Sequence, residues 1–146
     1  MTEGSRSHYE VIVIGAGVAG IYQIKRLSDL GIDALVLDAA PDLGGTWYWN
    51  RYPGARFDSE SYTYGYSFSR ELLDEWHWKE RFSAQPENLR YLNYVADKFD
   101  LRKYMQFNCK VQAATFDEAS DIWRLRLGDG RELTCRFVVL AIGLLS

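Results

Sequence analysis

The stretch YEVIVIGAGVAG, at residues 9–20, constrains the fold more than any other part of the sequence. A short apolar run, Val11 to Ile14, leads into three glycines spaced G-x-G-x-x-G, and apolar residues then recur every three positions, as on one face of a helix. Gly31 follows this repeat, at the place where a helix commonly ends in a left-handed residue. The pattern predicts a buried strand, a glycine-rich turn and a helix.

A second strand is indicated by DALVLD, which ends at Asp38. Strand, helix and strand together form a β-α-β unit, in which a right-handed crossover joins two parallel strands. Near the C-terminus, FVVLAIG is uniformly apolar up to Gly143, which predicts a strand of the same sheet that is buried on both faces. We therefore expect an α/β fold with a Rossmann-like parallel sheet of the FAD-binding type.

The middle of the chain is less regular. Residues 41–81 have weak periodicity and predict a long irregular connection with one short helix at 70–75. The sequence QPENLRYLNYVADKF then predicts a helix with one apolar face and with Pro86 in its first turn.

Strand-like alternation returns in the C-terminal half. Apolar and polar residues alternate over 105–112 and again over 123–127, which predicts strands with one buried face. Asp129-Gly130 favours a tight hairpin turn in which both residues have positive φ. These signals predict a small antiparallel meander.

Length and composition limit the function. A chain of 146 residues fits one domain, which we place at 9–146 after a disordered tail at 1–8. The net charge of −3, without a basic stripe, argues against nucleic acid as a partner, and the N-terminal apolar run is too short to span a membrane. Cys109 and Cys135 lack metal-type spacing, so we expect two small buried thiols and a cytoplasmic protein.

The glycine turn and the acid after the second strand together predict a dinucleotide site. Gly15 allows the tight turn, Gly17 lets a pyrophosphate approach the backbone, and Gly20 permits close helix packing. Asp38 is placed to accept hydrogen bonds from ribose hydroxyls and would repel a 2′-phosphate, which favours FAD or NAD over NADP at this site. The alternative is a turn that needs glycine for its geometry alone.

Downstream, GGTWYWNRYPGARFDSE adds a second glycine pair and three large aromatic residues. No cysteine precedes position 109, which argues against thiol–disulfide chemistry. Simpler interpretations remain open here: Trp47 and Trp49 could cap the core, Asp58 could cap a helix at SESY, and Pro53-Gly54 fits a type II turn.

The string GGTWYWNRYPGARFDSESYTYGYSF, read with GAGVAG, AIGLLS and EWHWKERFSAQPENLRYLNYVADKFDLR, strongly resembles the N-terminal part of the FAD domain of Baeyer–Villiger monooxygenases. The resemblance implies an oxidoreductase with FAD and NADPH as cofactors and with a ketone and O₂ as substrates. Such an enzyme inserts oxygen next to the ketone carbonyl through a C4a-peroxyflavin and releases an ester or lactone. The NADPH domain and the rest of the FAD domain would be its partners, so this chain alone would be inactive.

The resemblance also implies roles for particular residues. Asp58 would be the catalytic residue, because it would orient an arginine of the NADPH-binding domain. Contacts with FAD or with the nicotinamide would come from Gly15, Gly17, Ala19, Gly20, Asp38, Gly45, Thr46, Trp47, Arg56, Phe57, Asp58, Tyr64 and Val111. Two other functions stay open: a related flavin enzyme that oxygenates nitrogen or sulfur, and a non-catalytic nucleotide-binding module.

Overall fold

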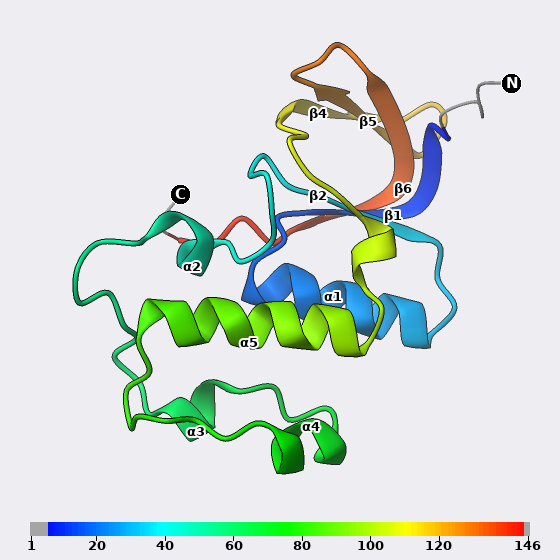
Figure 1. The fold of residues 1–146 in the computed structure, drawn as a ribbon. Helices are drawn as coiled ribbons and strands as arrows, with labels where there is room; N and C mark the ends of the chain where they lie inside the picture. Colours follow the sequence, from blue (N-terminus) through cyan, green and yellow to red (C-terminus); the bar gives the residue numbers. More distant parts are fainter. Residues whose placement is uncertain (1–5, 145–146) are drawn as a thin grey trace, which may run out of the picture.

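The computed structural model describes residues 6–144 and contains one six-stranded sheet with the strand order β3-β2-β1-β6-β5-β4. The first four strands in this order run parallel, and β6, β5 and β4 form an antiparallel meander (Figure 1). This confirms the expected Rossmann-like fold. The strands are β1 (His8–Ile14), β2 (Ala34–Leu37), β3 (Met105–Gln106), β4 (Val111–Asp117), β5 (Ile122–Leu127) and β6 (Glu132–Leu140).

The predicted β-α-β unit is confirmed at the N-terminus. Helix α1 (Val18–Asp29) starts directly after the glycine turn and connects β1 to β2, which pair in parallel. It ends as expected at Gly31, whose φ is +68°, and the N–H of Ile32 donates to the carbonyl of Leu27 at 3.0 Å. These two features are typical of a Schellman motif, which satisfies carbonyls that the last helical turn leaves unpaired.

Side-chain alternation in the parallel strands divides the core into two layers. Val11 and Val13 of β1 face α1 and helix α5 (Gln85–Lys98), whereas Ile12 packs under the meander. Figure 1 shows α1 and α5 side by side on one face of the sheet, with the segment that contains α3 and α4 on the far side of α5. Strand β6 pairs in parallel with β1 on one side and antiparallel with β5 on the other, so it belongs to both the parallel sheet and the meander.

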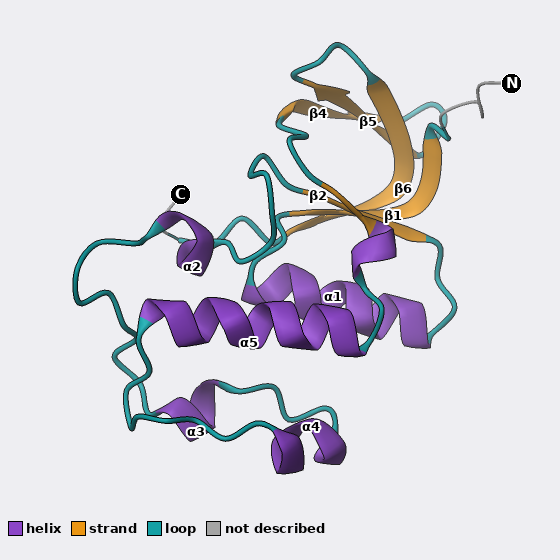
Figure 2. Cartoon of the chain, in the orientation of Figure 1, coloured by secondary structure: helices purple, strands orange, loops and turns teal. Residues whose placement is uncertain are grey.

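The connection between β2 and α5 is mostly loop, as Figure 2 shows, and contains three short helices. The predicted helix at 70–75 is confirmed as α4 (Arg70–Glu75), whose N-cap Ser69 accepts a hydrogen bond from the N–H of Leu72. Helix α2 (Thr46–Trp49) was not predicted, and α3 (Ser61–Tyr64) was raised only as a possible helix at SESY, because four residues are too few to show a helical period. The predicted α5 is also confirmed, with a proline in its first turn.

The prediction of one strand over 105–112 is wrong. Strand β3 contains only two residues, a 3₁₀ turn (Arg102–Tyr104) precedes it, and Asn108 follows it with a φ of +56°. The N–H groups of Asn108 and Cys109 donate to carbonyls of the loop after β2, at 2.9 and 2.8 Å, in place of a neighbouring strand. The chain then crosses to the opposite edge of the sheet, where β4 begins.

Two details of the meander also differ from expectation. In the hairpin between β5 and β6, Gly130 has a φ of +89° but Asp129 does not have a positive φ, so the predicted turn type is wrong. The turn instead spans Leu127 to Gly130, with the glycine N–H donating to the Leu127 carbonyl at 3.1 Å. Strand β6 pairs in parallel with β1 as predicted, but Phe137 and Leu140 are 53% and 66% exposed, because α1 and α5 pack over β1 and β2 instead.

The disordered N-terminal tail expected at 1–8 does not extend as far as residue 8. His8 already belongs to β1, and the carbonyl of Ser7 accepts a hydrogen bond from the N–H of Thr134 at 2.8 Å. Residues 1–5 of the expected tail lie outside the described residues. Over residues 6–144, no helix combines the length and the apolar character that crossing a membrane requires.

Candidate nucleotide-binding site

A cavity of about 640 Å³ opens where the carboxyl ends of β1, β2 and β6 meet the start of α1. In doubly wound sheets this edge is where nucleotides bind. Eight of the residues proposed from the sequence line the cavity: Gly15, Gly17, Ala19, Asp38, Gly45, Thr46, Tyr64 and Val111. The fold therefore brings together segments that are far apart in the sequence.

Glycines form the floor of the cavity because three backbone segments approach each other there. A Cβ atom on Gly15 would collide with the carbonyl of Ala141, and one on Gly20 would collide with the carbonyl of Gly15. A Cβ on Gly45 would lie 2.8 Å from the Cα of Gly17. The N-terminus of α1 adjoins this floor, and its unpaired N–H groups favour an anion such as a pyrophosphate.

The carboxylate of Asp38 is held by backbone N–H groups on both of its oxygens. Oδ2 accepts from Ala16 in the glycine turn at 2.7 Å, and Oδ1 accepts from Ala40 at 2.8 Å. Each carboxylate oxygen has a second lone pair, so Asp38 can still accept from a ribose hydroxyl. The side chain thus fixes the glycine turn to the end of β2 as well as lining the cavity, a role that the sequence analysis missed.

The aromatic residues after the second glycine pair form a wall two rings deep. The ring of Tyr64 lines the cavity, and behind it Trp47 donates its indole N–H to the Tyr64 hydroxyl at 2.8 Å. Phe57 stacks on Tyr64 with ring centres 4.1 Å apart. Burial raises the pKa of Tyr64, so its hydroxyl keeps its proton and can also donate.

The simpler interpretation, that Trp47 and Trp49 cap the core, holds only for Trp47. Trp47 belongs to the core with 5% exposure, whereas Trp49 lines the cavity and is 62% exposed. The type II turn at Pro53-Gly54 is confirmed, since Gly54 has a φ of +81° and the N–H of Ala55 donates to the carbonyl of Tyr52 at 3.1 Å.

Five of the proposed site residues lie outside the lining of the cavity. Gly20 packs against the glycine turn, while Trp47 and Phe57 belong to the core. Arg56 is exposed and donates to the Glu80 carboxylate at 3.0 Å and to a backbone carbonyl. Asp58 is also exposed.

The possibility that Asp58 caps a helix is wrong, because α3 begins at Ser61 and its N-cap is Glu60. The proposed contacts of Arg56, Phe57 and Asp58 with a nicotinamide stay predictions.

The cavity also contains residues that the sequence analysis did not propose. Trp49 and Asn50 extend from α2, and Cys109 and Lys110 arrive from the crossing between β3 and β4. No local pattern marks the last two, because they are placed by the bond from the Cys109 N–H to the Asp38 carbonyl, which joins two loops. Both cysteines are buried and unpaired, as expected.

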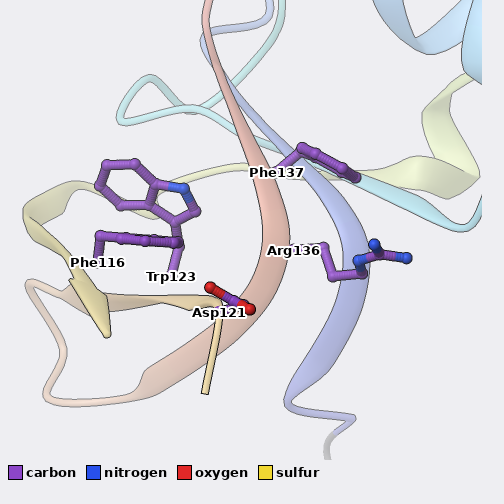
Figure 3. Close-up of a pocket in the computed structure, with 5 residues that line it drawn as sticks. All are labelled: Phe116, Asp121, Trp123, Arg136 and Phe137. Carbon is purple, nitrogen blue, oxygen red and sulfur yellow. The ribbon is translucent and has the colours of Figure 1, made fainter. Parts of the chain in front are cut away.

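A second hollow, of about 420 Å³, lies at the meander formed by β4, β5 and β6 (Figure 3). It is lined by Phe116, Asp121, Trp123, Arg136 and Phe137. Glycine-turn and helix-N-terminus features are not part of this lining, so we assign no nucleotide site to it. Across residues 6–144 no group of three or more His, Cys, Asp or Glu side chains is arranged to hold a metal ion.

Comparison with known proteins supports the nucleotide site. A family described as an NAD(P)-binding Rossmann-like domain matches residues 13–76. The chain is 48% identical, over 94% of its length, to 2-oxo-Δ³-4,5,5-trimethylcyclopentenylacetyl-CoA monooxygenase of Pseudomonas putida, of which it covers 25%. It is 45% identical, over 94% of its length, to a Baeyer–Villiger monooxygenase of Pseudooceanicola batsensis, of which it covers 26%. The chain is homologous to the N-terminal part of Baeyer–Villiger monooxygenases.

Solved structures agree with this homology to Baeyer–Villiger monooxygenases. An oxidized steroid monooxygenase bound to NADP matches 96% of the chain with a TM-score of 0.94 and 49% identity, and the chain covers 27% of it. A structure of OTEMO in complex with FAD and NADP matches 94% of the chain with a TM-score of 0.90 and 48% identity, and the chain covers 26% of it.

One relative is named for oxygenation of nitrogen. Phenazine N-monooxygenase of Lysobacter antibioticus is 44% identical over the whole chain, which covers 27% of it. The chain thus spans about a quarter of the length of each of these relatives.

Proposed function

We propose that this chain is the FAD-binding part of a longer NADPH- and O₂-dependent Baeyer–Villiger monooxygenase, which inserts oxygen next to a ketone carbonyl and gives an ester or lactone. The observation that carries the proposal is the cavity floor of backbone glycines with Asp38 at its edge. Its relatives include ketone-oxidising enzymes, and one similar structure was solved with FAD and NADP. The longer protein is called the complete enzyme below.

The residues present fit FAD. The glycine floor leaves room for a pyrophosphate beside the N-terminus of α1, and the free lone pairs of Asp38 suit the ribose hydroxyls. The cavity volume, about 640 Å³, lies within the ordinary range for cofactor sites. When bound, FAD supplies the oxygen-transfer chemistry.

The chain's own residues would orient the cofactor and keep water away from it. The Tyr64 ring and the core residues behind it form a rigid apolar wall, while Thr46 and the Tyr64 hydroxyl offer hydrogen bonds to the cofactor. Asp58 is exposed, so a second domain can reach it. In the proposed enzyme this carboxylate orients an arginine of the NADPH domain.

Product analysis of the complete enzyme tests the proposal. With NADPH, O₂ and a cyclic ketone we expect a lactone, and Asp58→Ala should retain FAD but lose lactone formation. Asp74→Ala is a matched control, because Asp74 is an exposed carboxylate on α4 whose partner is Arg70. An enzyme that retains FAD but consumes no O₂ with NADPH would instead be a nucleotide-binding module.

A second candidate function is supported by the phenazine N-monooxygenase relative. Oxygenation of nitrogen or sulfur would use the same cavity and cofactor, with a different substrate pocket. Incubation of the complete enzyme with a cyclic ketone, a thioether and an aromatic nitrogen heterocycle in competition separates the candidates. An N-oxide or sulfoxide without lactone would favour the second function.

The proposal includes the setting of the enzyme. Both cysteines are free thiols, which fits a reducing compartment, so we place the enzyme in the cytoplasm. Its macromolecular partner is the remainder of the enzyme, on the same or a separate chain. The chain alone, given NADPH and a ketone, should form no ester.

A further inference from the structure

Aromatic side chains form a continuous series of ring contacts that begins at the cavity. Tyr64 lines the cavity and is hydrogen-bonded to Trp47 behind it at 2.8 Å. The ring of Phe57 contacts both, with centre-to-centre distances of 4.1 and 5.7 Å. On its other side Phe57 meets Trp78 at 5.9 Å. The contacts thus lead from the cavity into the segment between α4 and α5.

The series continues to the surface of the protein. Trp78 contacts Trp76 at 5.8 Å, and Trp76 contacts Tyr94 of α5 at 5.3 Å. Tyr91 contacts both tryptophans, at 4.8 and 5.1 Å. Apart from Phe57, every ring along this route is a tryptophan or a tyrosine, the two aromatic side chains that are most easily oxidised by one electron.

The last ring has a proton acceptor. The Tyr94 hydroxyl donates to the carboxylate of Glu75, which also pairs with Lys98 at 2.8 Å. This hydrogen bond raises the pKa of Tyr94, so the phenol is protonated at rest. When a phenol loses an electron it becomes strongly acidic, and a carboxylate in contact can take its proton.

Trp76, the ring before Tyr94 in the series, lacks a proton acceptor. The indole N–H of Trp76 is buried and has no hydrogen-bond partner within the part of the chain that the structure describes. An oxidised indole loses its proton only to an acceptor, so an electron vacancy on Trp76 stays mobile. Phenylalanine could also supply ring contacts at these positions, but it is less easily oxidised than tryptophan or tyrosine.

We propose that this series of rings moves oxidising equivalents from the FAD site to the surface, and so protects the site from oxidation, through Tyr64, Trp47, Trp78, Trp76 and Tyr94. The proposal rests on the proposed function, because FAD and O₂ supply the oxidant. It adds a protective electron-transfer role to the aromatic residues between α4 and α5 and on α5, to which the proposed reaction assigns no role.

Each event on this route is a one-electron transfer. A hydroxyl radical formed from peroxide in the cavity takes an electron from Tyr64 or Trp47 and becomes hydroxide, and the vacancy is filled in turn by electrons from Trp78, Trp76 and finally Tyr94. The phenol proton of Tyr94 passes to the neighbouring carboxylate as its electron leaves. A small thiol at the surface then donates a hydrogen atom to the tyrosyl radical and becomes a thiyl radical, two of which couple to a disulfide. The carboxylic acid releases its proton to water, where it balances the hydroxide formed in the cavity.

A light pulse on the complete, FAD-loaded enzyme tests the route without turnover, because photoexcited FAD is itself a one-electron oxidant. Transient absorption and electron paramagnetic resonance should detect a long-lived tyrosyl radical in the wild type. Tyr94→Phe and Trp78→Phe should each abolish it. Tyr94→Phe removes only a hydroxyl from a half-buried ring, so the fold is retained.

Tyr62→Phe is the matched control. Tyr62 also hydrogen-bonds to a glutamate, Glu60, but its ring makes no ring contact among the described residues, so the radical should persist in this variant. A radical of equal yield and lifetime in wild type, Tyr94→Phe and Trp78→Phe would overturn the proposal.

A second readout uses oxidative damage. During NADPH oxidation without ketone, peptide mass spectrometry should find oxidised Trp47 and Tyr64 sooner in Tyr94→Phe than in wild type; equal damage would count against the route. FAD absorbance is recorded before each experiment. Failure to hold FAD refutes the proposed function, whereas retained FAD without a Tyr94-dependent radical refutes only the electron-transfer route.

Discussion

Replacing Asp38 by asparagine tests whether this carboxylate organises the glycine turn or only binds a ribose. In the structure, Oδ2 accepts from the N–H of Ala16 at 2.7 Å and Oδ1 accepts from the N–H of Ala40 at 2.8 Å. Asparagine has the same shape, but one of its two oxygens becomes an NH₂ group. One backbone N–H would therefore face a second donor before any cofactor binds.

The cost follows from the two hydrogen bonds. A bond to a charged acceptor contributes about 1.5–3 kcal/mol and one to a neutral acceptor about 0.5–1.5 kcal/mol, so the bond that remains weakens by about 1 kcal/mol. The N–H that loses its acceptor costs about 1–3 kcal/mol more. The sum, about 2–4 kcal/mol, corresponds to opening of the turn that is roughly 30- to 700-fold more frequent, since 1.4 kcal/mol is a factor of ten.

Amide hydrogen exchange at Ala16 and Ala40 in the FAD-free enzyme measures this opening directly. We expect Asp38→Asn to accelerate exchange at both amides and to weaken FAD binding in a parallel titration. Asp38→Glu is the matched variant, because it keeps the charge and should retain more of both properties. Weaker FAD binding with wild-type exchange rates would refute the organising role and leave Asp38 as a ribose ligand alone.

Three further predictions concern stability and reactivity. Gly45→Ala should lower FAD affinity and cost about 1–3 kcal/mol of stability, because the added Cβ would lie 2.8 Å from a backbone atom and the φ of Gly45 is +53°. The control Gly54→Ala also has a positive φ but has no neighbour within 4 Å, so chemical denaturation should show a smaller loss of stability. Burial raises the pKa of Tyr91 to about 12, so the unfolded state loses this proton first and stability falls as pH rises from about 10 to 12. Tyr91→Phe should lack that part of the alkaline loss but cost about 1–3 kcal/mol at pH 7 in urea unfolding, because the Tyr66 N–H loses its acceptor. Burial also raises the pKa of the Cys135 thiol, so iodoacetamide should alkylate it only after unfolding, as peptide mass spectrometry would report.

The β-α-β unit could be predicted from the sequence because each of its signals is local. A strand of apolar residues, a turn that requires glycine and a helix that ends at Gly31 each depend on neighbours within a few residues, and all three agree with the structure. The predicted α4 and α5 are also confirmed: α5 was located from its apolar face and its proline, and in the structure α4 also begins with a local signal, the capping serine. Local consistency is also why the position of the cavity followed from the glycine turn.

The prediction failed where contacts between distant loops compete with a local pattern. The alternation over 105–112 is that of a strand, yet the left-handed Asn108 and the bond from the Cys109 N–H to the Asp38 carbonyl turn this segment toward the end of β2. As a result Cys109 and Lys110 line the cavity, which no alternation of apolar residues could indicate. Conversely, the end of β6 from Phe137 to Leu140 is uniformly apolar, as in a buried strand, although Phe137 is half exposed. Composition does not say which neighbours are present.

The two tryptophans of α2 show how local geometry decides between interpretations that the sequence leaves open. Successive residues of a helix are rotated by about 100°, so residues two positions apart point to nearly opposite sides. With Trp47 directed into the core and hydrogen-bonded to Tyr64, Trp49 must point outward, and it lines the cavity on the exposed side of the same turn. One tryptophan therefore supports the cavity wall from behind while the other borders the cavity, and both requirements are met by a helix of only four residues. These two roles explain why the aromatic residues are concentrated directly after the second glycine pair, where the backbone passes the cavity.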